Sequence, residues 1–599
     1  MLLYAIIFFM KFIWSYMRKH IKAIILVMFV KLAATGLELL LPYILEHVID
    51  HVAPQRNVGL VVLWGIIMIA LALVVRFLSV GANRGSVKIA KKCIYKVRQD
   101  LFTKSMNLSG DQMDETGLPS LISRMTSDSY NLQSFMQTVQ TLAIRAPILL
   151  FGGIIITLTM DTGLALVLII MAPILLVAVV IISRKGIPLY DIVQTHLDSV
   201  VRIMRENITG IRVVKALSKE DYEKRRFEKA NETMSRSEIK ASVVMSLPGP
   251  VISLAMNVGL TLVVLIGALR VNRGVTEPGV ILAFLTYFQM ILMGVLILNR
   301  FFLNMSKANA SANRIAAVMK SPEGLAVKTD TQKAPSDDFI IFDDVSFNYG
   351  AGLNAAGQQK GKDTSSAFAG GHRENTLIDI DFRIPRGGSL GIIGATGSGK
   401  TTIINLLMRF YDPQQGNVFI DGKDVRSYGL DELRRRFGVV FQNDAIFADT
   451  IEENIRFGRD VDANKMQAAA ENAMASEFIN GYEDTYKHQA AIHGANFSGG
   501  QKQRLLVSRA LAAHPEILIL DDSSSALDYR TDAQLRHNIR EHYGDTTTIV
   551  VAQRVSSIMN LDQIIMLDEG RIIGKGTHAE LLQSTPRYRE IFETQMGEV

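Results

Sequence analysis

The sequence predicts a multidomain fold, in which a six-helix, all-α transmembrane domain precedes an α/β domain of the P-loop type. Two observations predict this order. The first half carries apolar runs of the length that crosses a bilayer, about 20 residues each. Beyond residue 320 the composition changes, and short apolar strands alternate with helical stretches, which is typical of an α/β domain.

The composition narrows the class of protein. The chain has 599 residues, and 48% of them are hydrophobic, which favours a membrane protein. The net charge of +6 gives no case for a nucleic-acid partner, because basic loops beside a membrane explain it. The single cysteine, Cys93, excludes an internal disulfide and suits a reducing compartment.

The apolar start, Leu2 to Trp14, shows no small-residue cleavage site. We interpret it as a membrane-surface helix leading into the first span, with a short extra span as the alternative. The six expected spans lie roughly at 21–49, 58–80, 139–159, 163–183, 247–270 and 279–301.

The first span carries two charges, Lys31 and Glu38. They are seven residues apart and therefore share one helix face. Charges within a span usually face the bundle interior or a water-filled cavity. A structural ion pair and a contact with substrate are equally good interpretations.

Loop charges predict the orientation. The two long polar connections, after the second and fourth spans, are rich in cations, which are Lys88, Lys91, Lys92, Lys96, Arg98, Lys215, Lys219, Lys224, Arg225 and Arg226. Positive loops stay in the cytoplasm. We therefore expect a multi-pass protein of the cytoplasmic membrane, bacterial in style, with both termini in the cytoplasm.

The expected domain limits are 1–319 for the membrane domain, 320–337 for a linker and 338–599 for the α/β domain. Residues 350–375 interrupt the second domain with a stretch rich in Gly, Ala, Ser and Gln. Such a stretch buries too little apolar area to order itself. We expect a surface insertion, and a functional role is the minority interpretation.

A strand, a glycine loop and a helix start follow one another in SLGIIGATGSGKTT, residues 389–402. The pattern G-x-x-x-x-G-K-T lets backbone N–H groups surround phosphates at a helix N-terminus. Lys400 would reach the β- and γ-phosphates, and Thr401 would hold Mg²⁺. The expected ATP-binding residues of this loop are Gly394, Ala395, Thr396, Gly397, Ser398, Gly399, Lys400, Thr401 and Thr402.

A second strand, ILIL, ends in two adjacent carboxylates. Asp521 would bind Mg²⁺ through water. Asp522 lies where an attacking water would be polarised.

Between these segments lies NFSGGQKQR, and here the chain resembles the nucleotide-binding domain of ABC transporters, whose signature is SGGQ. The resemblance implies that Tyr349 stacks on adenine and that Gln442 links Mg²⁺ to the membrane domain. The signature residues are Ser498, Gly499, Gly500 and Gln501, and the D-loop residues are Ser525, Ala526, Leu527 and Asp528. The tail, 570–582, also fits the family.

The N-terminal half resembles the membrane domain of type IV exporters. ENITGIRVVKALSKED, residues 206–221, fits the second cytoplasmic connection, and GLPSLISRMTSD, residues 117–128, fits the first. The resemblance therefore covers nearly the whole chain.

Three departures from the family pattern concern hydrolysis. The position of Asp522 usually holds Glu, and that of Gln553 usually holds His. A carboxylate drawn back by one C–C bond can cost about a hundredfold in rate. A glutamine bonds the γ-phosphate but lacks the charge of a histidine. The segment 488–496 also lacks the acidic residues usual before the signature. We therefore expect a degenerate hydrolytic site, whose catalytic residues are Asp522, Gln553 and Gln442.

In this family two such domains enclose two ATPs, and each ATP lies between the glycine loop of one chain and the signature of the other. The resemblance therefore implies one half of a heterodimeric exporter that uses ATP and Mg²⁺, hydrolyses poorly at its own site and completes its partner's site. A homodimeric exporter with slow turnover and an ATP-switched membrane regulator that transports nothing are the alternatives.

The sequence leaves the substrate open. Spans five and six carry flexible thioethers and aromatic rings, which suit an apolar pocket, although ordinary packing explains most of them. These residues are Met245, Met256, Phe284, Tyr287, Phe288, Met290 and Met293. Small-molecule, lipid and peptide substrates all remain open, and membrane lipids are expected contacts.

Overall fold

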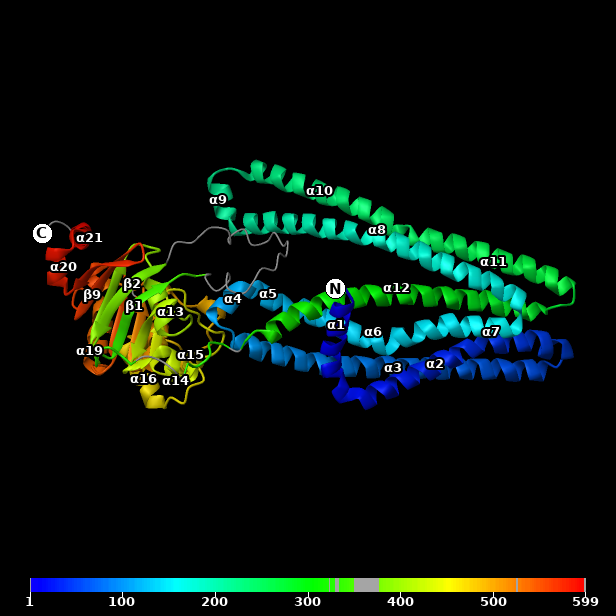
Figure 1. Cartoon of the computed structure of the whole chain (residues 1–599), viewed down its shortest axis with the longest axis horizontal. Helices are drawn as coiled ribbons and strands as arrows, with labels where there is room; N and C mark the ends of the chain where they lie inside the picture. The colour runs from blue at the N-terminus through cyan, green and yellow to red at the C-terminus, as the bar shows by residue number, and fades with distance from the viewer. Residues whose placement is uncertain (1, 323, 329–332, 350–375, 524–525, 597–599) are drawn as a thin grey trace. The chain divides into compact units, whose positions relative to one another are not determined.

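The computed structural model describes the chain except residues 1, 323, 329–332, 350–375, 524–525 and 597–599 (Figure 1). The insertion, part of the linker and the D-loop residue Ser525 therefore lie outside the described residues. The chain divides into two compact units. The first comprises Met1–Met106 and Leu118–Ser321, and the second comprises Asn107–Gly117 and Pro322–Val599.

The first unit is helical. Its α-helices are α1 (Leu2–Met17), α2 (Ile21–His47), α3 (Val58–Met106), α5 (Leu118–Ser123), α6 (Ser129–Pro147), α7 (Gly153–Met160), α8 (Thr162–Thr209), α9 (Ile211–Ala216), α10 (Glu220–Ser246), α11 (Pro248–Asn272) and α12 (Pro278–Lys320). Short 3-10 and π-helical turns connect several of them.

Among the described residues, six helical segments are long and apolar enough to cross a membrane. They are Phe9–Gln55, Val58–Met106, Leu118–Met160, Thr162–Thr209, Glu220–Asn272 and Pro278–Lys320. The predicted fold class is confirmed. The helices are longer than a bilayer requires, because each continues into the polar connections that the sequence places outside the apolar runs.

Small residues let these helices approach closely. A Cβ on Gly85 of α3 would lie 2.7 Å from Val27 of α2, and one on Gly259 of α11 would lie 2.3 Å from the ring of Phe288. Because lipid gives no hydrophobic drive between helices, close backbone packing of this kind holds a membrane bundle together. Figure 1 shows α8 running beside α10 and α2 beside α3.

Ion pairs join helices within this unit. Asp161 caps the start of α8 through the backbone N–H groups of Gly163 and Leu164, and it accepts a hydrogen bond of 3.0 Å from Arg270 Nε. The ion pair between Lys31 and Glu38, which was one of the two interpretations of these charges, is not formed. Glu38 instead accepts a 2.9 Å hydrogen bond from Arg145 of α6. The spacing along one helix could not reveal this cation, because it lies on another helix.

The second unit contains the sheets. Its strands are β1 (Ile340–Phe347), β2 (Leu377–Ile384), β3 (Ser389–Gly394), β4 (Gln415–Ile420), β5 (Lys423–Asp424), β6 (Phe437–Val440), β7 (Ile517–Asp521), β8 (Thr547–Val551), β9 (Gln563–Asp568) and β10 (Arg571–Gly576). One sheet has the order β2-β1-β4-β5, and the other has the order β10-β9-β3-β8-β7-β6.

Strands β9, β3, β8, β7 and β6 run parallel to one another, so their carboxyl ends meet at one edge, and β10 pairs with β9 in the antiparallel direction. Strand β7 is buried along its whole length, as expected of a strand covered on both faces. The glycine loop follows β3 and the two carboxylates follow β7. The sheet therefore brings together segments more than a hundred residues apart in the sequence.

The α-helices of the second unit are α4 (Gly110–Thr116), α13 (Lys400–Leu407), α14 (Leu430–Arg434), α15 (Ile451–Arg456), α16 (Ala463–Asn472), α17 (Ser476–Ile479), α18 (Gly499–Leu511), α19 (Tyr529–His542), α20 (His578–Ser584) and α21 (Pro586–Met596). Helix α4 comes from the connection between the second and third membrane segments, yet it belongs to this unit.

Candidate nucleotide site

The glycine loop between β3 and α13 depends on backbone that only glycine adopts without strain. Gly397 and Gly399 have φ of +87° and +101°. A Cβ on Gly399 would also lie 2.5 Å from the side chain of Leu377. The Nζ of Lys400 donates to the carbonyl oxygens of Gly394 at 2.9 Å and Ala395 at 2.7 Å. The loop therefore holds its own cation in place.

Thr401 and Asp521, two of the predicted magnesium ligands, lie side by side. The Thr401 hydroxyl donates to the Asp521 carboxylate at 3.2 Å. A hydroxyl and a carboxylate supply the hard oxygen ligands that Mg²⁺ prefers, so the residues fit the ion. Burial raises the pKa of Asp521, while the Thr401 hydrogen bond lowers it.

A pocket of about 250 Å³ lies over this loop. Its lining residues are Thr376, Thr396, Gly397, Gly399, Lys400, Thr401, Thr402, Gln442, Asp521, Asp522, Val551, Ala552 and Gln553. The glycine loop, both carboxylates, Gln442 and Gln553 thus share one cavity. Thr376, Val551 and Ala552 were not predicted, since nothing in their local sequence distinguishes them from ordinary strand and strand-end residues. Ser398 is buried, and its hydroxyl lacks a partner within the described residues.

The residues expected to handle the attacking water hold one another. Asp522 Oδ2 accepts a hydrogen bond from Gln553 Nε2 at 3.0 Å and a longer one from Gln442 Nε2 at 3.5 Å. Asp522 has φ of +49°, a region that Asp enters much more readily than most residues. Burial raises the pKa of Asp522, and the nearby charge of Lys400 lowers it. Two amide donors therefore hold one oxygen of the carboxylate that was predicted to polarise the attacking water.

The C-terminal helix supports this arrangement. Gln595 of α21 donates to the carbonyl of Gln553 at 2.9 Å and accepts from the N–H of Val555 at 2.8 Å. Sequence reasoning missed Gln595, because its partner lies far away in the sequence and no motif marks it.

Tyr349, the expected adenine-stacking residue, lies at the edge of the glycine-loop helix. Its hydroxyl donates to Thr402 at 3.2 Å and accepts from Asn405 at 3.1 Å. Its ring packs edge-on against Phe347 and Tyr411, with centroids 4.8 and 5.1 Å away.

Tyr411 in turn attaches α4. Its hydroxyl donates to the carboxylate of Asp114 at 2.8 Å, and the N–H of Gly110 donates to the carbonyl of Phe410 at 3.2 Å. A Cβ on Gly110 would lie 2.5 Å from the Tyr411 ring, so only glycine allows this approach. A chain of contacts therefore leads from α4 through Tyr411 to Tyr349. Tyr411 and Asp114 were not predicted as site residues.

The signature forms the start of α18. Ser498 caps the helix by accepting from the N–H of Gln501 at 3.3 Å, while the Gln501 side chain accepts from the N–H of Ser498 at 2.9 Å. This reciprocal cap fixes the backbone of Gly499 and Gly500. The N–H groups in the first turn of a helix point outward and attract anions. The D-loop is attached here, since the N–H of Ala526 donates to Gln503 at 3.0 Å. Leu527 is buried, and Asp528 caps α19 through Thr531.

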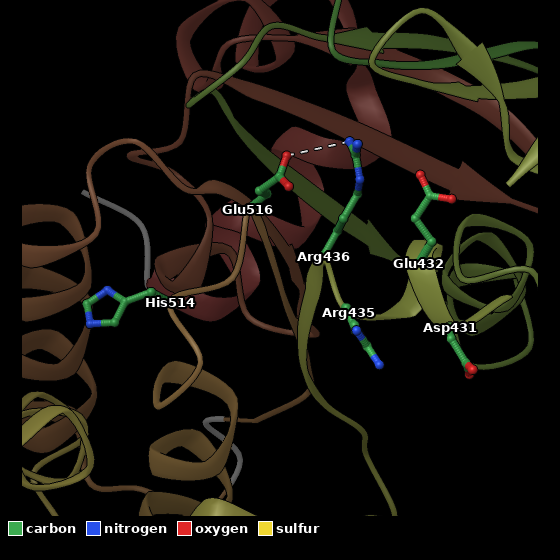
Figure 2. A pocket seen from close by; sticks show the side chains of 6 residues that line it. All are labelled: Asp431, Glu432, Arg435, Arg436, His514 and Glu516. Carbon is green, nitrogen blue, oxygen red and sulfur yellow. Dashed lines mark ion pairs between the residues drawn. The ribbon is translucent and has the colours of Figure 1, made fainter. Parts of the chain in front are cut away.

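A second cavity, of about 430 Å³, lies at the opposite edge of the same sheet (Figure 2). Its lining residues are Asp431, Glu432, Arg435, Arg436, His514 and Glu516. Arg436 and Glu516 precede the parallel strands β6 and β7 and form an ion pair of 3.5 Å. Three carboxylates lie beside two arginines in this cavity and partly neutralise them, so no functional assignment follows from it.

The fold and this site define a membrane protein whose α/β domain binds a nucleotide. Two family models match the chain, one described as the ABC transporter transmembrane region at residues 24–296 and the other as ABC transporter at residues 377–525. An ABC transporter ATP-binding protein of Mycobacterium tuberculosis is 31% identical over 585 residues, which cover 97% of each chain. The protein YfiB of Bacillus subtilis, which has the same description, is 31% identical over 567 residues, or 94% of this chain and 95% of that protein.

The chain belongs to the ABC transporter family. A solved structure of a bacterial Atm1-family ABC exporter with ATP bound matches with a TM-score of 0.78 at 22% identity, covering 97% of this chain and 99% of that chain. This likeness shows that the two share the exporter fold. The chain is therefore a multi-pass membrane protein with an ATP-binding domain, an ATPase-coupled transporter by family.

Proposed function

We propose that this protein is one half of a heterodimeric ABC exporter, in which its own ATP site hydrolyses poorly and its signature completes the active site of a partner subunit. The observation that supports this most is the contrast between Asp522, whose carboxylate is engaged by Gln553 and Gln442, and the fully capped signature at Ser498.

At its own site the chain is equipped to hold ATP. Lys400 would exchange the carbonyls of Gly394 and Ala395 for the phosphates, since a phosphate offers the ammonium a full negative charge and a carbonyl offers only a dipole. Tyr349 would lie against the base. Thr401, Asp521 and Gln442 would hold Mg²⁺, which when bound neutralises charge on the phosphates.

Hydrolysis requires a base that orients and deprotonates water. Asp522 is shorter than the usual glutamate, and it already accepts a hydrogen bond from Gln553. Gln553 supplies no positive charge to the transition state. Both defects concern water attack and leave phosphate binding intact, so ATP would be retained at this site and turned over at the other.

Coupling to the membrane helices would pass through α4. Asp114 and Gly110 attach this helix to Tyr411 and Phe410, which directly follow the glycine-loop helix α13. A shift of α13 on nucleotide binding would therefore move the connection between α3 and α5. Both termini and the long connections would be cytoplasmic, as their cations favour.

The test is co-purification with a candidate half-transporter that carries Glu and His at the two positions, followed by ATP-dependent transport in proteoliposomes. The proposal expects transport from the mixed pair and little from this chain alone. Equal transport by this chain alone would favour a homodimer of slow turnover. ATP binding without transport in either assembly would favour a membrane regulator.

A further inference from the structure

Lys31 is a cation inside the membrane-spanning unit. It lies in α2, one helical turn from Val27 on one side and from Thr35 on the other, and all three side chains are buried. Only 4% of the Lys31 surface is exposed. Its position on the same face as Val27, which packs against Gly85 of α3, directs the side chain into the helix bundle.

Lys31 has no polar partner in the part of the chain that the structure describes. Within the described residues, no hydrogen bond or ion pair reaches its ammonium group, and the one hydrogen bond at this residue is accepted by its backbone carbonyl from Thr35. Glu38 does not neutralise it, because Glu38 is bonded to Arg145 at 2.9 Å. Lys31 lies two helical turns from Glu38 on the same face of α2, so its charge stands near the Glu38–Arg145 pair. Among the described residues of this cluster, two cations thus face one carboxylate.

Arg145 also has an unused donor. One of its terminal nitrogens binds Glu38, while its Nε is enclosed and has no hydrogen-bond partner within the described residues. An ammonium and a guanidinium are donors only. Both unused groups therefore call for an acceptor, and the uncompensated charge calls for an anionic one.

An unpaired cation within a membrane span is costly, and such residues usually serve a substrate or ion pathway. We propose that Lys31 and Arg145 bind the anionic group of an amphiphilic substrate, such as a carboxylate, phosphate or sulfonate on an apolar body. The apolar body follows from the surroundings, because the buried face of α2 that carries Lys31 also carries the apolar side chains of Ile24, Val27 and Ala34. This inference rests on the proposed export function and names its substrate class.

The experiment uses the full-length protein in phosphatidylcholine nanodiscs and two fluorescent probes of equal length, a pyrene-labelled alkyl sulfonate and the corresponding uncharged sulfonamide. The wild type should bind the sulfonate more tightly. Lys31→Met should weaken sulfonate binding about tenfold or more and leave sulfonamide binding unchanged, since it removes a charge-assisted hydrogen bond. Lys31→Arg should keep the preference for the sulfonate.

The matched control is Lys22→Met, which removes an exposed cation from the same helix. It should leave both affinities unchanged. Equal affinity of the wild type for the two probes would overturn the proposal, even if Lys31→Met failed to fold. An equal loss of both probes in Lys31→Met would overturn it too, since Lys31 would then serve packing or pair with a carboxylate of the partner subunit.

A second arm distinguishes the sources of the anion. Nanodiscs containing phosphatidylglycerol should weaken sulfonate binding in the wild type and not in Lys31→Met if lipid headgroups enter the site. Unchanged binding assigns the site to amphiphiles that are not bulk lipid. Neither arm measures hydrolysis or transport, so equal binding of the two probes would leave the export proposal standing. Conversely, a preference for the sulfonate without any ATP-dependent transport would refute only the export proposal.

Discussion

The two halves of the nucleotide pocket are built differently. On one side, Lys400 is bonded to backbone carbonyls and Thr401 to the buried Asp521. On the other, Asp522 depends on the flexible amides of Gln442 and Gln553, both partly or fully exposed in this structure. The half that we propose binds ATP, called the binding half, is thus held by the backbone, and the half that we propose for hydrolysis, called the hydrolytic half, consists of partly or fully exposed side chains. Losing hydrolysis therefore need not cost ATP binding.

The largest effect should come from the signature. In the heterodimer, Ser498→Ala should lower ATP turnover about a hundredfold, since it disturbs preorganised donors that would face the partner's nucleotide. Thr577→Ala is the matched control, because Thr577 makes the same reciprocal cap on α20 away from the pocket. Both changes should lower the free energy of unfolding by about 1 kcal/mol. Only Ser498→Ala should lower the steady-state ATPase rate. Equal losses of turnover would mean that Ser498 acts only as a cap.

The binding half is tested by Lys400→Ala. This change should weaken ATP binding at this chain's site at least tenfold, because the phosphates lose a charge-assisted hydrogen bond. Lys423→Ala, which removes an exposed cation outside the pocket, should change nothing. Binding of a fluorescent ATP analogue measures both variants. An unaltered affinity in Lys400→Ala would show that the glycine loop does not hold the phosphates.

The hydrolytic half should be repairable only as a unit. Asp522→Glu alone should recover little activity, since glutamate tolerates the φ of +49° less well than aspartate and Gln553 still lacks a charge. The double variant with Gln553→His should gain more than the sum of the single variants. The assay is ATPase of the heterodimer with the partner's catalytic glutamate changed to glutamine. Simple additivity would argue that the two positions do not act together.

A smaller effect should appear at α4. Tyr411→Phe keeps the ring beside Tyr349 and removes the hydrogen bond to Asp114. ATP affinity should stay the same, while stimulation of ATPase by substrate should fall about fivefold, since a bond to a charged group is lost. Tyr428→Phe is the control, because its buried hydroxyl bonds the carbonyl of Ile420 and not α4. Unaltered stimulation in Tyr411→Phe would exclude this route of coupling.

Sequence-based prediction is most informative where a short local pattern determines the structure. The apolar runs predicted six spanning helices, and the alternation after residue 320 predicted the α/β domain. Asp521, Asp522, Gln442, Gln553 and most of the glycine loop were named from the sequence and line one pocket, while Tyr349, Gly394, Ala395 and Ser398 are not among its lining residues. The roles of all these residues stay predictions. What it missed depends on long-range packing: no local pattern couples Tyr411 to Asp114 or Gln595 to Gln553, and helix spacing alone could not pair Glu38 with Arg145.

The central claim, that this chain's own site contributes little hydrolysis, is tested most directly by Asp522→Asn in an otherwise intact heterodimer. The variant removes the carboxylate proposed as the base and keeps the size of the side chain. Steady-state ATPase should fall less than about threefold, because catalytic groups removed from an already impaired set cost little more. A loss of turnover as complete as that caused by Ser498→Ala would show that this site hydrolyses ATP and would contradict the account.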